Sequence, residues 1–167
     1  MLNENKYIFL DIDGVLATLR QYYSNNRKWH KEFKVYNFDK KCVNVLNAIM
    51  EETNAIIILS SDWRINYDLE TMNRIFQYNN VKAVINDFTE DFWGDRSLNK
   101  AMRYDLAKCR ANEINKYIVD NNISTYVVID DLDMNEWFPN NFVCTEDHQG
   151  IKKSNVKEKI IKILNNE

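Results

Sequence analysis

Glycine, proline and cysteine are all scarce in this chain of 167 residues, which contains three glycines, one proline and three cysteines. So little glycine and proline excludes collagen-like and low-complexity sequences. Hydrophobic residues make up 45% of the chain, which is enough for an ordinary buried core. An odd number of widely separated cysteines, without a CxxC pair, argues against a disulfide framework and against a zinc knuckle. We therefore expect free thiols in a reducing compartment and no disulfide partner.

Long apolar runs and an excess of positive charge are also absent. No stretch approaches the roughly 20 apolar residues of a membrane helix, and the apolar run at residues 7–10 is too short for a signal peptide. The chain has 22 Lys and Arg against 25 Asp and Glu, a net charge of −3, so any site for an anion must be local. These features predict a cytoplasmic protein without a membrane partner, folded as a single domain over residues 1–167.

Short apolar segments alternate along the chain with segments of helical periodicity. The apolar segments are continuous and rich in β-branched residues, which predicts buried strands at residues 7–10, 55–59, 81–85 and 126–129, with a weaker fifth at 142–144. Segments with one apolar helical face lie between them, and another ends the chain. This alternation indicates right-handed βαβ units, so we expect an α/β fold, a three-layer sandwich with a central parallel sheet.

Polar residues follow three of these strands directly. They are Asp11, Asp13 and Gly14 after the first strand, Ser60, Ser61 and Arg64 after the second, and Asp130 and Asp131 after the fourth. The carboxyl ends of parallel strands meet at one edge of the sheet, where ligands bind. Carboxylates gathered there raise one another's pKa unless a cation is present, which predicts a bound metal. Oxygen ligands without histidine or cysteine favour Mg²⁺.

Each of these motifs, taken alone, also fits ordinary turn chemistry. Asp-x-Asp-Gly is a common Asx turn, paired serines are common helix N-caps, and paired aspartates are common in turns. An EF-hand does not fit, because Gly14 is the fourth residue from Asp11 and Tyr22 is the twelfth. Turn chemistry alone does not predict that three strands all end in groups suited to metal or phosphate at one edge.

Four motifs occur in a fixed order over residues 7–133: DIDGV, IIILSS, a basic residue on a helix, and VVIDD. This order resembles that of the haloacid dehalogenase (HAD) superfamily of phosphotransferases. The finer patterns LSSDWR, RANEI and YVVIDD are similar to those of minimally capped phosphatase domains of RNA-repair proteins. The resemblance implies a Rossmann-like fold without a large cap domain, and a phosphorylated substrate.

The resemblance also implies a catalytic role for several residues. Asp11 would be the nucleophile that forms an aspartyl-phosphate, and Asp13, on the same side of the strand end, would be the general acid and base. Ser60 would donate a hydrogen bond to the transferring phosphate. The basic residue that screens nucleophile and phosphate would be Arg110, with Lys108 as the alternative.

Metal and substrate contacts follow from the same comparison. Mg²⁺ would be held by Asp11, by the backbone carbonyl of Asp13, and by Asp131 with Asp130 beside it, the division between the last two being open. The candidates for substrate binding are Gly14, Ser61 and Arg64. Gly14 fits a sharp turn of the backbone, Ser61 is alternatively a helix N-cap, and Arg64 is alternatively a solvent-exposed residue.

Residues 18–38 form an insertion that combines aromatic and basic side chains. The aromatic residues are Tyr22, Tyr23, Trp29, Phe33, Tyr36 and Phe38, and five bases stand against Glu32 alone, a net charge of +4. Such a segment suits a polyanionic or base-bearing substrate, because rings stack on bases and Lys and Arg contact phosphates. The alternative is a flap whose aromatic side chains pack on the sheet and whose charges face water.

Our main hypothesis is a Mg²⁺-dependent phosphomonoester hydrolase that acts on nucleic-acid ends. The first alternative is a phosphatase of nucleotides or other small esters. A non-catalytic binding module for phosphate or metal is the second, and it does not explain Asp13, because a binder needs no general acid. A site without a cap is open, which suits a large substrate or an oligomer that shields the site.

Overall fold

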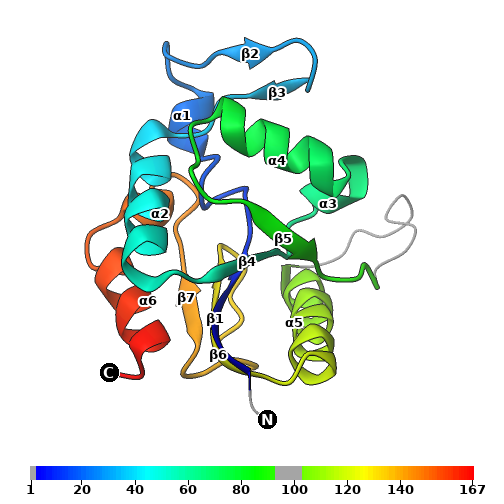
Figure 1. Cartoon of the computed structure of the whole chain (residues 1–167). Coiled ribbons are helices and arrows are strands. Elements are labelled where there is room, and N and C mark those ends of the chain that lie inside the picture. The colour runs from blue at the N-terminus through cyan, green and yellow to red at the C-terminus, as the bar shows by residue number, and fades with distance from the viewer. Residues whose placement is uncertain (1–2, 93–102) are drawn as a thin grey trace.

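The computed structural model describes residues 3–92 and 103–167, and its centre is a five-stranded sheet (Figure 1). The strands are β1 (Asn3–Leu10), β4 (Ile56–Leu59), β5 (Ile85–Phe88), β6 (Ile123–Asp130) and β7 (Phe142–Cys144). Their order is β5-β4-β1-β6-β7, and every neighbouring pair is parallel. The expected α/β fold with a central parallel sheet is confirmed.

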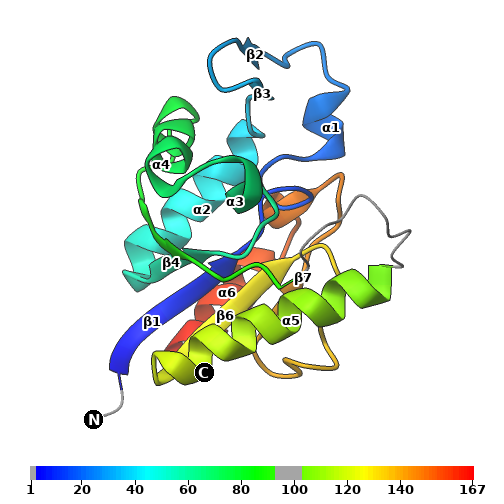
Figure 2. The ribbon, with the colours of Figure 1, turned by 90° about the vertical axis from the view of Figure 1, so that its right-hand side faces the viewer.

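Helices cover both faces of this sheet and give it three layers (Figures 1 and 2). On one face lie α2 (Lys40–Thr53), α4 (Leu69–Tyr78) and α6 (Val156–Asn165), and on the other lies α5 (Arg103–Asp120). Side chains alternate along β1, so that Ile8 and Leu10 pack in the first core while Tyr7 and Phe9 pack in the second. Because the strands are buried on both faces, they are continuously apolar in the sequence.

The strand expected at residues 81–85 was placed too early, because β5 begins only at Ile85, which pairs with Ile57 of β4. Residues 81–84 instead connect α4 to the sheet, and the side chain of Asn47 accepts a hydrogen bond from the Lys82 N–H (2.9 Å). Val84 is 60% exposed, so this apolar run is not core throughout. An edge strand does not need a continuous apolar run, which explains why the sequence INDF of β5 gave no signal.

The segment between β1 and α2 stands over the carboxyl edge of the sheet (Figure 1). It contains α1 (Leu19–Tyr22) and an antiparallel hairpin of β2 (Trp29–His30) and β3 (Val35–Tyr36). Phe33 and Phe38 are buried in the core, as a flap packed on the sheet requires, whereas Tyr22, Tyr23 and Trp29 are exposed. The interpretation as a packed flap therefore holds for Phe33 and Phe38, while Tyr22, Tyr23 and Trp29 lie at the surface. Within the described residues no other segment forms a cap.

The short elements and the cysteines complete the fold. The helix α3 (Trp63–Asn66) follows β4, and the 3-10 helix η2 (Gly150–Lys152) precedes α6. All three cysteines are free thiols, as expected. In the described parts of the chain, no helix is both long enough and apolar enough to cross a bilayer.

Candidate active site

Three neighbouring strands bring their polar ends to one edge of the sheet. Leu10 at the end of β1 is in register with Leu59 of β4 and with Ile129 of β6. The residues that come next, Asp11, Ser60 and Asp130, therefore lie at one level. The convergence expected from the motifs follows from the parallel order β4-β1-β6.

Three carboxylates of this edge form a compact cluster that fits a magnesium ion. Asp11, Asp130 and Asp131 each present one oxygen, and these oxygens all lie within 4.8 Å of one another. Burial raises the pKa of Asp131, as does the charge of Asp11, although a hydrogen bond from Arg103 opposes the rise. A cation would relieve this repulsion, and a donor set made only of oxygens suits Mg²⁺.

The two adjacent aspartates differ in their surroundings. Asp130 is fully buried, and its Oδ1 accepts from the Leu132 N–H (2.8 Å) while its Oδ2 accepts from Arg110 Nη1 (2.8 Å). Burial raises the pKa of Asp130, and the Arg110 guanidinium opposes the rise. Asp131 borders the cleft described below and accepts on Oδ2 from Arg103 Nη2 (3.0 Å). Asp130 is thus engaged inside the protein, whereas Asp131 faces the cleft.

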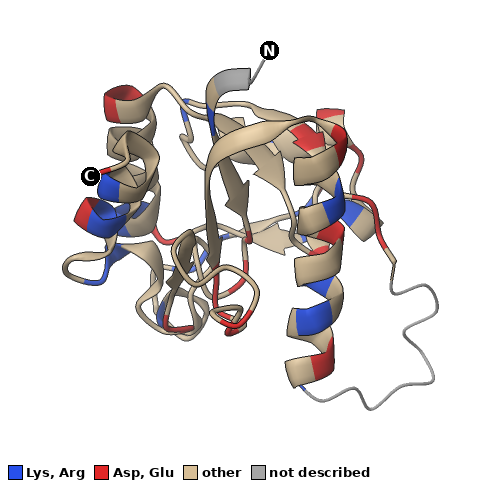
Figure 3. Cartoon of the chain, turned by 90° about the horizontal axis from the view of Figure 1, so that it is seen from below, with Lys and Arg blue, Asp and Glu red and all other residues tan. Residues whose placement is uncertain are grey.

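Arg110 lies at the centre of the acidic cluster. Its Nη1 donates to Asp11 Oδ2 (3.0 Å) as well as to Asp130, and its Nη2 donates to Asp62 Oδ1 (2.8 Å). Basic and acidic residues are interspersed along α5 (Figure 3), and Lys108 is exposed while Arg110 is buried. Of the two basic residues considered, Arg110 is therefore the one that contacts Asp11.

Asp13 points into the cleft. Its Oδ2 accepts a hydrogen bond from the indole Nε1 of Trp63 (2.8 Å). Desolvation by the surrounding protein raises the pKa of Asp13 to about 6; the Trp63 hydrogen bond lowers it, and the charges of Asp11 and Asp131 raise it. The carboxyl group is held by the ring and remains open to a substrate in the cleft.

The hydroxyl group of Ser60 is buried without a partner. Among the described residues, Ser60 and Thr89 are the two whose buried side-chain oxygens make no hydrogen bond. A buried polar group without a partner destabilises a protein by about 1–3 kcal/mol, so such a group calls for a ligand or a bound water. Ser61 differs, because its Oγ accepts from the N–H of Trp63 (3.5 Å); the N-cap residue of α3 is Asp62, not Ser61 as considered from the sequence.

Arg64 is not placed as a substrate contact, contrary to our expectation. Its side chain is 3% exposed, and Nη2 donates to Glu113 Oε2 at 2.6 Å. Its other N–H groups donate to nearby main-chain carbonyls, two of them those of Ser60 and Ser61. With its donors engaged inside the protein, Arg64 positions the segment that carries Ser60.

We expect the substitution Arg64→Met to lower the free energy of unfolding by about 3–5 kcal/mol, because it leaves Glu113 buried and unpaired. Urea denaturation measures this loss. The control is Arg74→Met, which breaks the exposed pair with Glu32 and should change stability by less than about 1 kcal/mol. Equal small losses in the two variants would contradict the positioning role.

Gly14 packs against Asp131 with a backbone that favours glycine. Its φ is +69°, and a Cβ at this position would lie 2.7 Å from both Cβ and Cγ of Asp131. The substitution Gly14→Ala must therefore strain the turn and displace Asp131. We expect it to reduce the activity of this site about 100-fold, because a displacement near 1 Å has an effect of that size in active sites. Full activity in a steady-state assay would show that the Asp131 position tolerates movement.

A cleft of about 680 Å³ opens over these residues, with Asp13, Gly14 and Asp131 along its lining. Its walls carry an unusual number of aromatic rings, namely Tyr22, Trp29, Tyr36, Trp63 and Tyr67. The rings of Trp29 and Tyr36 meet edge-on with centroids 4.9 Å apart. Of the exposed aromatic side chains of the insertion, Tyr22 and Trp29 thus line the same cleft as Asp13.

A comparison with protein families agrees with this geometry. The family model described as "HAD domain in Swiss Army Knife RNA repair proteins" matches residues 7–156. The chain belongs to this HAD family. No curated protein and no solved structure matches the chain. Membership confirms the expected HAD resemblance and supports an enzyme of the hydrolase and phosphatase type.

Four residues that contact or support the site of this HAD domain were not predicted from the sequence. Trp63 and Asp62 stand inside the LSSDWR motif, where an indole N–H and a further carboxylate directly after Ser60 and Ser61 were the available signal. Arg103 precedes Arg110 by seven residues, a spacing that places both on one face of a helix. Glu113 gave no signal, because its buried partner Arg64 is distant in sequence.

Proposed function

We propose that this HAD domain is a Mg²⁺-dependent phosphomonoester hydrolase that acts through an aspartyl-phosphate on a nucleic-acid end. The observation that carries the proposal is the meeting of four groups at one edge of the sheet. Asp11 is held by buried Arg110, the Ser60 hydroxyl lacks a partner, and Asp13 faces the cleft. A phosphate placed between them would meet a nucleophile, a hydrogen-bond donor and an acid.

In the first half-reaction a carboxylate oxygen of Asp11 attacks the phosphorus atom. The bond between phosphorus and the leaving oxygen breaks, and that oxygen takes the proton of Asp13. Arg110, which donates to Asp11, fixes the carboxylate and reduces its repulsion for the anionic phosphate. The Ser60 hydroxyl gains its missing hydrogen bond by donating to a phosphate oxygen.

The second half-reaction returns Asp11 to its starting state. Asp13, now ionised, removes a proton from a water molecule that attacks the phosphorus of the aspartyl-phosphate. The bond between phosphorus and the Asp11 oxygen breaks, which releases inorganic phosphate. Trp63 holds Asp13 through its indole N–H, so one carboxyl group serves both steps from the same position.

The metal site would consist of Asp11, the backbone carbonyl of Asp13, and Asp131. Asp130 would support them through Arg110 and the Leu132 N–H, since both of its oxygens are engaged inside the protein. When bound, Mg²⁺ supplies positive charge that offsets the repulsion between carboxylate and phosphate and stabilises the transferring group.

The aromatic cleft supports a nucleic-acid end as the substrate. Trp29, Tyr36, Trp63 and Tyr67 in the lining of the cleft offer rings on which a terminal base can stack. Stacking on aromatic rings binds bases with little regard to sequence. The matching family is named for RNA repair, which agrees with a polynucleotide substrate.

The test is the release of inorganic phosphate from 3′- and 5′-phosphorylated oligonucleotides, mononucleotides and an aryl phosphate, each with Mg²⁺ and with chelator. We expect chelator-sensitive turnover of one type of oligonucleotide end well above that of the small esters. A preference for mononucleotides or small esters would mean that the substrate is a small phosphate ester and not a nucleic-acid end, while the proposed chemistry would stand. No turnover in any reaction, with Mg²⁺ bound, would indicate a binding module.

A further inference from the structure

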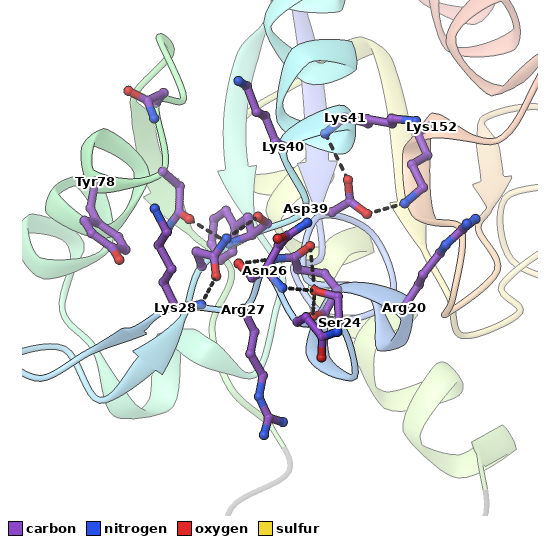
Figure 4. A pocket seen from close by; sticks show the side chains of 16 residues that line it. Arg20, Ser24, Asn26, Arg27, Lys28, Asp39, Lys40, Lys41, Tyr78 and Lys152 are labelled. Atoms are coloured by element: carbon purple, nitrogen blue, oxygen red, sulfur yellow. Dashed lines mark hydrogen bonds and ion pairs between the residues drawn. The ribbon is translucent and has the colours of Figure 1, made fainter.

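A second pocket, lined in part by the insertion, lies apart from the residues of the candidate active site. Its volume is about 860 Å³, and Figure 4 shows its lining side chains coming from α1, the loop after α1, the start of α2, the end of α4, and η2. We call it the basic pocket, because six of its lining residues are basic: Arg20, Arg27, Lys28, Lys40, Lys41 and Lys152. Asp39 is the one acidic residue in its lining.

The positive charge of the basic pocket is largely uncompensated. Asp39 is already engaged by the Lys152 ammonium group and by the Lys41 backbone N–H. Within residues 3–92 and 103–167, no carboxylate lies within ion-pair distance of Lys28, Lys40 or Arg20, nor of the Lys41 side chain. In a chain whose net charge is −3, this concentration of free bases defines a local anion-binding surface.

The basic pocket adjoins the aromatic cleft. Gln21 and Asn37 line both hollows, so the two share a wall. Arg27 lines the basic pocket and lies over the rings of Tyr22 and Tyr36, at 5.7 and 5.3 Å from their centroids. These two rings belong to the aromatic cleft, so cationic and aromatic groups continue from one hollow into the other.

We propose that the basic pocket binds the phosphodiester backbone of a single-stranded polynucleotide whose terminal phosphate lies at Asp11. This inference rests on the proposed function and specifies its substrate as a strand several nucleotides long. Basic side chains that follow a backbone, next to aromatic side chains that stack on bases, are the usual means of binding single strands. Tyr78 and the neutral amide of Asn80 in the lining suit sugars and bases.

The test measures binding separately from catalysis. The Asp11→Asn chain is titrated with a fluorescent, phosphorylated decanucleotide at several salt concentrations. In that background, the double variant Lys28→Gln/Lys40→Gln, which removes two positive charges from the basic pocket, should weaken binding about tenfold at low salt. It should also reduce the slope of log K against log salt by about 1.4, since each lost phosphate contact on a single strand accounts for about 0.7.

The matched control is Lys159→Gln/Lys162→Gln, which removes the same charge from exposed positions on α6. Equal weakening by both double variants would overturn the proposal, because attraction by net charge would then explain the binding. With Asp11 intact, Lys28→Gln/Lys40→Gln should reduce kcat/KM for the decanucleotide about tenfold and leave turnover of an aryl phosphate unchanged. Equal losses on both substrates would also contradict it.

The two proposals fail in different ways. If the unaltered chain releases no phosphate from any oligonucleotide, the proposed function fails, while the titration still decides whether the basic pocket binds a strand. If phosphate is released at rates independent of strand length and the pocket variant equals the control, the basic pocket has no such role and the phosphatase assignment stands.

Discussion

The substitution Asp11→Asn should abolish phosphate release, with a fall in kcat of at least about 1,000-fold. An amide oxygen is a poor nucleophile toward phosphorus, and no other carboxylate of the cluster is free to replace Asp11. Asp130 is tied to Arg110 and to the Leu132 N–H, and Asp131 is placed to bind metal. The measurement is the initial rate on the best substrate of the phosphate-release panel, with Mg²⁺.

Binding should survive this substitution. Asn keeps the shape of the side chain, and Arg110 retains its contacts to Asp130 and Asp62. The Asp11→Asn chain should therefore fold and bind a phosphorylated oligonucleotide. The matched control is Asp62→Asn, which removes another carboxylate from the same guanidinium at a half-exposed position. It should reduce the rate by less than about tenfold. Similar losses in the two variants would show that Asp11 acts by holding Arg110 and not as the nucleophile.

The sequence predicted the sheet and the acidic edge because both depend on local patterns. Strands buried on both faces are continuously apolar, and the motif residues follow those strands directly, so parallel order alone brings them together. The edge strand β5 was not predicted at its true position because two of its four residues, Asn86 and Asp87, are polar. Its position depends on Asn73, whose side chain binds the Ile85 backbone through the N–H and the carbonyl.

The contacts between distant side chains could not be predicted. Arg64 lies one residue beyond LSSDW and looked like a surface residue near a phosphate site, yet Glu113 on α5 draws it into the interior. Which of Arg110 and Lys108 faces the site depends on how α5 is rotated about its own axis. Tertiary packing sets that rotation, and the sequence alone does not give it. Three bases of the basic pocket, Arg20, Arg27 and Lys28, belong to the cationic insertion already evident in the sequence, whereas Lys40, Lys41 and Lys152 join them only in the fold.

Arg110→Met should lower the free energy of unfolding by about 3–5 kcal/mol in the presence of chelator. The guanidinium is the partner of Asp11 and Asp130, and both carboxylates would remain buried without it. Mg²⁺ binds the same cluster in the proposed function and supplies positive charge there. The loss should therefore be smaller at saturating Mg²⁺, and Mg²⁺ should stabilise the variant more than the unaltered chain. Urea denaturation under both conditions gives the four free energies needed.

Arg103→Met serves as the control for this prediction. Arg103 pairs with Asp131 at 3.0 Å, but its side chain is 68% exposed, so removing it should change stability by less than about 1 kcal/mol. Comparable losses for the two arginines would mean that the buried carboxylates do not depend on Arg110. A loss for Arg110→Met that is the same with Mg²⁺ and with chelator would mean that the cation binds elsewhere. The metal site proposed at Asp11 and Asp131 would then be wrong, even if the enzyme requires Mg²⁺.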